Sequence, residues 1–378
     1  MNINLYSKPI FILYLIVFIL MILLFYFQTN LENLGFHNLV FTDGYTHSKA
    51  VREFINGQRN IFEQRSAWLM PLIYSIPSYL LGSVGVLIFN NLLIYFFYKI
   101  NLKHKINILT LFFFTPFYFF SSFLPNKENP VLFLVGLYLL FIYKEKYFLS
   151  FIVAVITFSI RDGQGILLII MTLLIIIKFP MRLALVMAFS FAIFIDSFLR
   201  EIADVTKIFV LQRTIGIIDN LNGEYLSYPV RIFATFTNLG SRSIVYQNDY
   251  ISLTGLSFYL AGIGIFIAFI LALYEIVIEY NKNSFFQNFT AILFLFSVIL
   301  FSISPLIQPR YIIPMAFLYL IYNERLKNKN RILITTIGGL IFLILLRVIY
   351  LFTIGLPETD SFFLDYDYIF YGGELLNE

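Results

Sequence analysis

The sequence contains no cysteine and few charged residues. The missing thiols exclude disulfide bonds, thiolate catalysis and cysteine-ligated metal sites. Charged residues make up 13% of the chain, whereas an ordinary soluble domain has about 25%. A chain this poor in charge cannot cover its surface with polar groups, so we expect lipid to be its solvent.

Hydrophobic residues make up 60% of the chain and aromatic residues 19%. The first apolar run follows a short polar start and lacks a small-residue cleavage site, so we expect a retained signal anchor. Counting runs that suit a hydrocarbon core of ~30 Å, we predict an all-α, polytopic integral membrane protein with a single membrane domain over residues 1–378. Its eleven predicted spans are 9–27, 83–99, 107–123, 130–143, 148–161, 165–179, 183–199, 254–279, 288–306, 311–323 and 331–354.

Basic residues divide the connections between these spans into two sets. Short basic connections alternate with longer, less basic ones, and the positive-inside rule puts the short set in the cytoplasm. This assignment gives a net charge of +9 inside and −5 outside, in agreement with +4 for the whole chain. We therefore expect a cytoplasmic N-terminus and an outer C-terminus.

The larger polar segments fall on the outer side, where function usually collects. Residues 48–55 have the composition and apolar spacing of a helix that lies on the membrane surface. Residues 66–82 then re-enter the apolar zone with two prolines, which predicts a shielded, outward-facing cavity. The outer segments are the first outer loop (28–82), the central outer loop (200–253) and the C-terminal tail (357–378).

Three very short predicted turns on the outer side carry charges with few solubilising residues. Charges at membrane depth line an interior site or pair with each other, although single ones also snorkel to the interface or form structural ion pairs. Guanidinium groups suit a phosphate because their donors fork around its oxygens. The three turns are Asn126–Asn129, Arg161–Gly165 and Gln308–Tyr311, and other ionisable residues at outer ends are Asp43, Asp196, Arg200 and Arg347.

The first outer loop resembles that of the GT-C superfamily of polyprenyl-phosphate-dependent glycosyltransferases, in Thr42–Tyr45, the helix over 50–57, Trp68–Pro71 and Gly82. Asn-Lys-Glu, Arg-Asp-Gly and Arg-Tyr in the three charged turns are similar to Wzy-type O-antigen and capsule polymerases. The resemblance covers about the first 180 residues and the last of those turns. It implies a GT-C-like glycosyltransferase of the bacterial inner membrane, with a periplasmic active site for undecaprenyl-type lipid-linked sugars.

The resemblance also implies roles for individual residues. An enzyme that uses a lipid-linked sugar needs cations for the leaving phosphate and a carboxylate for the acceptor hydroxyl. Asp43 would orient or deprotonate the acceptor, with Glu128 as the reserve base. Because Gly44 follows Asp43 where related loops often have a second acidic residue, we assign no metal ligands, and a divalent cation stays an open alternative. The expected phosphate ligands are Lys127, Arg161, Arg310 and Arg347, and the expected glycan contacts are Tyr225, Tyr228, Arg231 and Arg242.

The expected partners are glycans linked to a polyprenyl phosphate or diphosphate, membrane lipid and other glycan-assembly proteins, with no nucleic acid. A repeat-unit polymerase is the favoured interpretation, and an enzyme that adds a single sugar is the alternative within the same chemistry. A lipid-linked oligosaccharide flippase or transporter is the alternative from another class, and it predicts internal repeats that the sequence lacks. For the central outer loop, an ordinary amphipathic cover is the competing interpretation.

Overall fold

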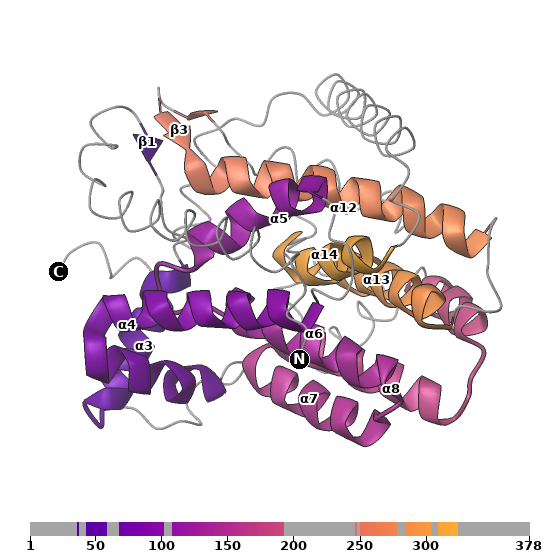
Figure 1. Cartoon of the computed structure of the whole chain (residues 1–378), viewed down its shortest axis with the longest axis horizontal. Helices are drawn as coiled ribbons and strands as arrows, with labels where there is room; N and C mark the ends of the chain where they lie inside the picture. The colour runs from indigo at the N-terminus through magenta and orange to yellow at the C-terminus, as the bar shows by residue number, and fades with distance from the viewer. Residues whose placement is uncertain are drawn as a thin grey trace, which may run out of the picture.

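The computed structural model describes the chain at residues 36–37, 43–58, 68–101, 108–192, 246–247, 250–277, 285–303 and 309–323. Helices make up nearly all of these residues, which confirms the predicted helical class (Figure 1). The described part of each predicted apolar segment overlaps a helix, whereas the first and last segments lie outside the described residues. The helices are α3 (Asp43–Ile55), α4 (Leu69–Asn101), α5 (Ile108–Ser121), α6 (Glu128–Tyr143), α7 (Tyr147–Ile160), α8 (Asp162–Ile176), an unlabelled helix over Met181–Ala192, α12 (Leu253–Val277), α13 (Phe285–Ile303), the 3₁₀ turn η3 (Pro309–Tyr311) and α14 (Ile313–Tyr322).

Helix length limits how many of these elements qualify as membrane spans on their own. Two described helices are long and apolar enough to cross a membrane, namely α4 and the Leu260–Val277 part of α12. Others are shorter, such as α7 with 14 residues and α14 with 10. At 1.5 Å per residue a 14-residue helix is about 21 Å long, which is less than a hydrocarbon core of ~30 Å. The coarse prediction of apolar spanning helices thus holds for α4 and α12.

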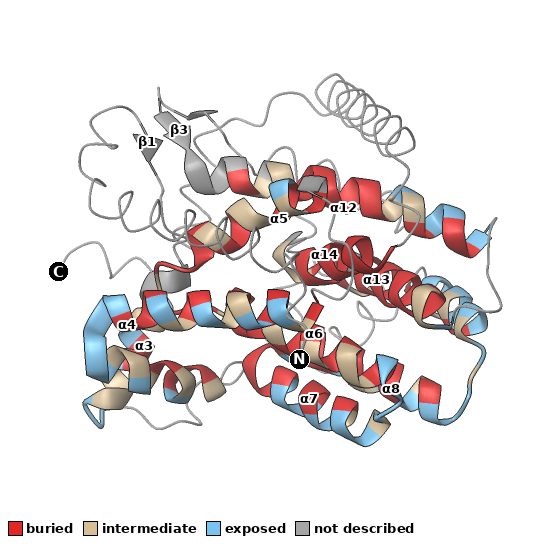
Figure 2. Cartoon of the chain, in the orientation of Figure 1, coloured by how far each residue is buried: buried red, intermediate tan, exposed pale blue. Residues whose placement is uncertain are grey.

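The helices pack around α14, which lies in the middle of the molecule (Figure 1). Helices α6, α7 and α8 pack in sequence order, α4 packs on α6, and α5 packs on α12. Helix α14 contacts α12, α13 and α6. Its ten residues are all buried, and Figure 2 shows the burial of α13 and α14 beside the exposed outer faces of α7 and α8. A short helix that is apolar on every side is stable only when other elements surround it.

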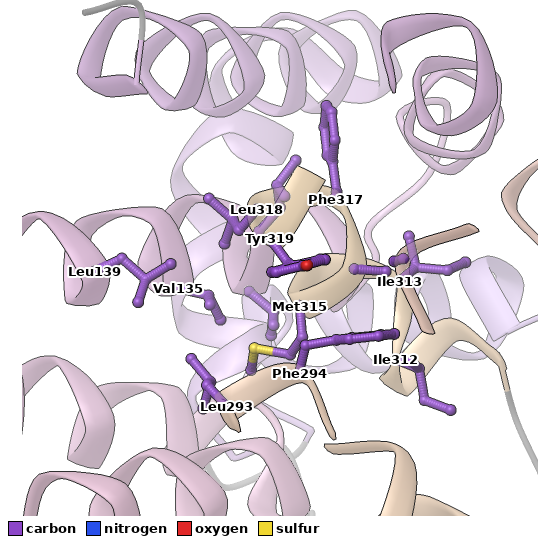
Figure 3. Packing of buried hydrophobic residues seen from close by; sticks show 14 of the residues in the cluster. Val135, Leu139, Leu293, Phe294, Ile312, Ile313, Met315, Phe317, Leu318 and Tyr319 are labelled. Atoms are coloured by element: carbon purple, nitrogen blue, oxygen red, sulfur yellow. The ribbon is translucent and has the colours of Figure 1, made fainter. Parts of the chain in front are cut away.

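Aromatic stacking holds α14 in this central place (Figure 3). The Tyr319 ring stacks on Phe294 of α13, with 5.8 Å between ring centroids. Phe317 faces the opposite way and stacks on Phe114 of α5, at 5.1 Å. Such pairs stabilise by about 0.5–1.5 kcal/mol each beyond the area they bury. Because η3 ends two residues before α14, this packing also fixes the position of η3.

Helix α4 contains a sharp break at Gly82, whose φ of 60° and ψ of −138° are not helical. A side chain at Gly85 would place its Cβ 2.0 Å from the carbonyl oxygen of Pro77, so the backbone on the two sides of the break approaches too closely for any other residue. The predicted first outer loop ends at this break. The predicted re-entry is helical from Leu69 onward.

A small three-stranded sheet accompanies the helices, and the all-α prediction did not include it. It consists of β1 (Phe36–His37), β3 (Tyr250–Ser252) and β2 (Tyr246–Gln247) in that order. Strand β1 runs parallel to β3, and β2 runs antiparallel to it. Ile251 pairs with a residue of each neighbour, so the backbone of the first predicted outer loop is joined to that of the central one.

Candidate functional site

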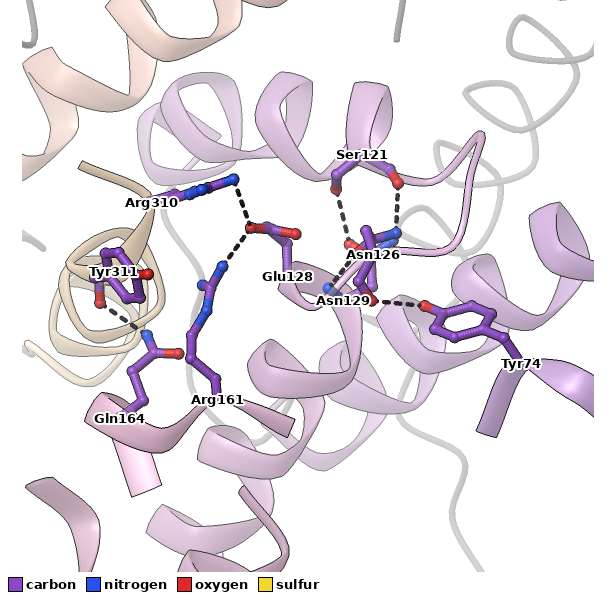
Figure 4. A network of polar contacts seen from close by, with 9 residues as sticks. All are labelled: Tyr74, Ser121, Asn126, Glu128, Asn129, Arg161, Gln164, Arg310 and Tyr311. Atoms are coloured by element: carbon purple, nitrogen blue, oxygen red, sulfur yellow. Dashed lines mark hydrogen bonds and ion pairs between the residues drawn. The ribbon is translucent and has the colours of Figure 1, made fainter. Parts of the chain in front are cut away.

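Three charged side chains from the predicted outer turns meet at one point in the structure (Figure 4). Nη2 of Arg161 donates a hydrogen bond to Oε1 of Glu128 at 2.6 Å. Nη1 of Arg310 lies 4.0 Å from the same carboxylate oxygen. Glu128 begins α6, Arg161 links α7 to α8, and Arg310 lies in η3. We call this group, together with the ring of Tyr311, the charged end of the helix bundle.

Arg161 reaches this point because it is the single residue between two antiparallel helices. Its backbone is extended, with φ −148° and ψ 101°, while α7 ends at the residue before it and α8 begins at the residue after it. A Cβ at Gly165 would lie 2.2 Å from Cα of Phe158, so only glycine permits the close crossing of α7 and α8. Gly165 is therefore required for the close packing of α7 and α8, and this packing sets the position of Arg161.

The ring of Tyr311 forms one wall of the charged end. Cζ of Arg161 lies 4.5 Å from the ring centroid, in cation–π geometry, and Cζ of Arg310 lies at 6.0 Å. The ring itself stacks on Phe301 of α13 at 5.0 Å. Nε2 of Gln164 donates to the backbone carbonyl of Tyr311 at 2.8 Å. These contacts tie η3 to the start of α8.

A buried network of neutral polar groups holds Glu128 at the start of α6 (Figure 4). Oδ1 of Asn126 accepts a hydrogen bond from the backbone N–H of Asn129 at 2.9 Å, which satisfies a free donor at the helix N-terminus. The Tyr74 hydroxyl donates to the backbone carbonyl of Asn126 at 3.0 Å, and Nδ2 of Asn90 donates to that of Ser122 at 2.9 Å. Helix α4 thus fixes the α5–α6 loop and, through it, the carboxylate.

The electrostatics of the charged end favour an ionised carboxylate. Glu128 is buried and precedes the predicted apolar span 130–143. Burial alone would raise the pKa of its carboxyl, but the charges of Arg161 and Arg310 and the hydrogen bond from Arg161 outweigh burial and lower that pKa to about 2. A carboxylate held in this way is a strong counter-ion and a weak base.

The guanidinium of Arg161 is itself 3% exposed, and most of its donors are unused. Among the described residues, Nε and Nη1 have no hydrogen-bond partner. Native proteins satisfy nearly all buried donors, so exceptions call for an explanation. The charged end therefore has unused donors, which a group with oxygen acceptors would satisfy.

The other residues singled out in the sequence have different outcomes. Lys127 adjoins Glu128 and is partly exposed. Asp43 is the first residue of α3, and its side chain falls outside the described part of the structure. Among the described residues no cluster of three metal-ligating side chains occurs. The remaining predicted phosphate and glycan ligands lie outside the described residues: Arg347, Tyr225, Tyr228, Arg231 and Arg242.

Sequence reasoning missed the neutral network and the wall formed by Tyr311. Tyr74, Asn90 and Asn126 support the site without carrying charge. One signal for Asn90 was available, because two adjacent asparagines interrupt the apolar run of α4. A buried amide in such a run indicates a hydrogen-bonded contact between helices.

A second polar cluster lies at the opposite end of the bundle. The Tyr319 hydroxyl donates to Oε2 of Glu275 at 3.0 Å, and Nδ2 of Asn323 donates to the Tyr319 hydroxyl at 2.7 Å. At the same end the Tyr322 hydroxyl donates to Oδ1 of Asn101, the last residue of α4. We call these five residues the amide end, and they join the predicted cytoplasmic ends of α4, α12 and α14.

No protein-family model, curated protein or solved structure matches this chain.

Proposed function

We propose that this chain is a polytopic membrane glycosyltransferase that uses sugars linked to a polyprenyl phosphate or diphosphate. In this proposal it polymerises polysaccharide repeat units at the outer face of the bacterial inner membrane. The observation that carries the proposal is the meeting of Arg161 and Arg310 at a buried point, from two predicted outer turns. Two guanidinium groups offer forked donors to the oxygens of a leaving phosphate and stabilise the charge that develops there.

The exposed apolar surface supports the membrane part of the proposal. Around the break in α4, Tyr79 is 77% exposed and Leu80 is 67% exposed. Large apolar side chains also cover the outer faces of α7 and α8, where Phe148 and Ile176 are exposed. Soluble monomers rarely expose contiguous apolar surface on this scale. Lipid contact on these faces would bring a donor with a polyprenyl tail to helices α7 and α8, which Arg161 links.

Within this proposal Arg161 and Arg310 bind the phosphate oxygens, with Lys127 and Arg347 as further cations. Asp43 handles the acceptor hydroxyl, since Glu128 is held in an ion pair and is the weaker base. The central outer loop binds the glycan through Tyr225, Tyr228, Arg231 and Arg242.

The test is conservative replacement of the two arginines. Arg161→Lys and Arg310→Lys keep the charge but cannot reproduce the planar fork, so each variant should lose most glycan extension from a lipid-linked acceptor while still accumulating in the membrane. Lys178→Arg, a change at the opposite end of α8, is the matched control and should keep full activity. Full activity of both lysine variants would reduce the pair to structural ion pairing.

The cellular glycan separates polymerisation from its alternatives. Deletion of a polymerase leaves single repeat units on the surface, deletion of a single-sugar transferase removes one sugar from each unit, and deletion of a flippase traps lipid-linked units inside. Export of a lipid-linked oligosaccharide stays the second candidate because Glu275 is buried within a helix bundle. Ionisable residues inside membrane proteins often mark transport pathways.

A further inference from the structure

Arg161 is a buried cation whose hydrogen-bonding capacity is mostly unused. Its side chain is 3% exposed, and only Nη2 has a described acceptor, the Oε1 atom of Glu128. Nε and Nη1 together carry three N–H groups that point to no acceptor among the described residues. A guanidinium normally engages a carboxylate or phosphate through two parallel hydrogen bonds. The ion pair with Glu128 uses one.

Glu128 is also an incomplete partner for the second arginine. Its Oε1 atom faces both guanidinium groups, yet the 4.0 Å separation from Nη1 of Arg310 is too long for a hydrogen bond. Figure 4 shows this oxygen between two cations that come from different elements. A phosphate group offers three or four oxygens and up to two negative charges, so it can contact both arginines at hydrogen-bonding distance, whereas Oε1 of Glu128 is within that distance of Arg161 alone.

We propose that Glu128 is a resident counter-ion which occupies an anion site and is displaced from Arg161 when a phosphate or diphosphate group binds. In the empty protein the carboxylate neutralises a buried guanidinium that would otherwise be costly. On binding, the ligand takes over Nη2 and gains Nε and Nη1 as additional donors. The identity of the ligand as the diphosphate of a lipid-linked glycan rests on the proposed function, whereas the displacement itself does not.

Displacement selects among anions. A ligand must outcompete a carboxylate that is already in place. A monovalent ion such as chloride therefore gains little binding free energy from the exchange, and a dianionic phosphate gains most. Displacement also separates Glu128 from its closest cation, which makes the carboxylate more basic at the moment when the donor arrives. A group that is a weak base in the empty protein then becomes available near the leaving phosphate.

The experiment measures inorganic pyrophosphate binding by the purified full-length protein at constant ionic strength. Glu128→Gln keeps the shape of the side chain and removes the competing charge, so it should bind pyrophosphate about tenfold more tightly than wild type, or better. Asp162→Asn is the matched control, because it removes a neighbouring exposed carboxylate that contacts its own turn through the N–H of Gly163. This control should stay within about twofold of wild type.

Two further variants make the result decisive. Glu128→Asp shortens the side chain by one methylene, so its carboxylate pairs less well with Arg161. This variant should also bind pyrophosphate more tightly than wild type, by a smaller factor. It provides the same test if the glutamine variant does not fold. Arg161→Lys should abolish the binding in either background. Equal or weaker binding by both Glu128 variants would overturn the displacement, and so would equal strengthening by Asp162→Asn.

The same measurements distinguish this proposal from the proposed function. If pyrophosphate binding depends on Arg161 but is unchanged in Glu128→Gln, the phosphate site is supported and the displacement of Glu128 is contradicted. A second arm uses farnesyl diphosphate, a short prenyl diphosphate. Tighter binding than pyrophosphate supports a lipid-linked ligand, whereas equal affinity keeps the displacement and counts against the lipid-linked donor. Absence of binding by every protein defeats both.

Discussion

Each end of the helix bundle buries a carboxylate, and the two carboxylates have different described partners. At the charged end Glu128 pairs with a buried guanidinium and faces a second one. At the amide end Glu275 accepts a hydrogen bond from a neutral hydroxyl, which an amide supports in turn. Removing one partner of a buried ion pair leaves the other charge uncompensated, which costs far more free energy than the loss of a single hydrogen bond. The charged end is therefore suited to exchanging partners with a charged ligand, and the amide end to holding helices together.

The largest expected effect follows from removing the cation of the charged end. Arg161→Met leaves Glu128 buried without its nearest partner, so the protein should lose about 3–5 kcal/mol of unfolding free energy. Denaturant unfolding in detergent measures the loss. The double variant Arg161→Met, Glu128→Gln should recover a large part of it, since no buried charge is then unpaired. A loss of the same size in the double variant would mean that packing of Arg161 matters more than its charge.

A smaller effect tests whether the turn geometry supports the charged end. Gly165→Ala forces a methyl group into the backbone of Phe158, so it should destabilise by about 1–3 kcal/mol and lower pyrophosphate affinity by shifting Arg161. Gly163→Ala is the control, because its Cβ would meet only the edge of the Phe301 ring at 3.1 Å. Equal behaviour of the two variants in unfolding and binding would show that the crossing of α7 and α8 tolerates a side chain.

The amide end should respond more weakly to loss of its charge. In Glu275→Gln the amide oxygen still accepts from the Tyr319 hydroxyl, but this hydrogen bond is no longer made to a charged group, so we expect a loss of about 1 kcal/mol. Thermal unfolding of this variant beside Arg161→Met compares the two ends directly. A loss as large as that of the arginine variant would place an ion pair at the amide end as well. If cells with the Glu275→Gln variant lose export of the lipid-linked oligosaccharide but keep polymerisation, the transport alternative is favoured.

The last effect concerns acidic pH alone. The pKa of Glu128 in the folded protein is lowered to about 2 from an ordinary value of 4.5. Its contribution to stability is therefore fully present above pH 4.5 and is lost as the pH falls from there through about 2. The difference in Tm between wild type and Glu128→Gln should stay constant from pH 8 to pH 6 and narrow below pH 4.5. A difference that changes near pH 6 would mean that the carboxyl is not held by Arg161.

Several parts of the site could be predicted from the sequence because they depend only on the number and order of the apolar segments. Alternation of apolar segments assigns Asn126–Asn129, Arg161–Gly165 and Gln308–Tyr311 to the same side, and the structure brings residues of all three into contact. The helical class follows from the apolar runs themselves. Neither inference needs knowledge of which helix packs on which.

The remainder depends on packing that no local pattern encodes. The choice of Glu128 as the partner of Arg161, rather than as a free base, requires the distance between two turns on different helices. The support from Tyr74 and Asn90 depends on α4 lying beside the α5–α6 loop. The pairing of β1 with β3 joins segments that are remote in the chain, and strands of two or three residues leave too short a pattern to detect.

The consecutive order of α6, α7 and α8 has a consequence for how the protein is made. Glu128 begins α6, and Arg161 directly follows α7, which packs on α6, so the two residues can pair before the later helices are made. Arg310 is synthesised later, after a delay of roughly 7–30 s at about 5–20 residues per second. During that interval each of the two early charges already has a partner of opposite charge, which would lower the free-energy cost of moving them into a bilayer. In the proposed membrane protein, Glu128 would thus neutralise Arg161 during insertion as well as in the folded state.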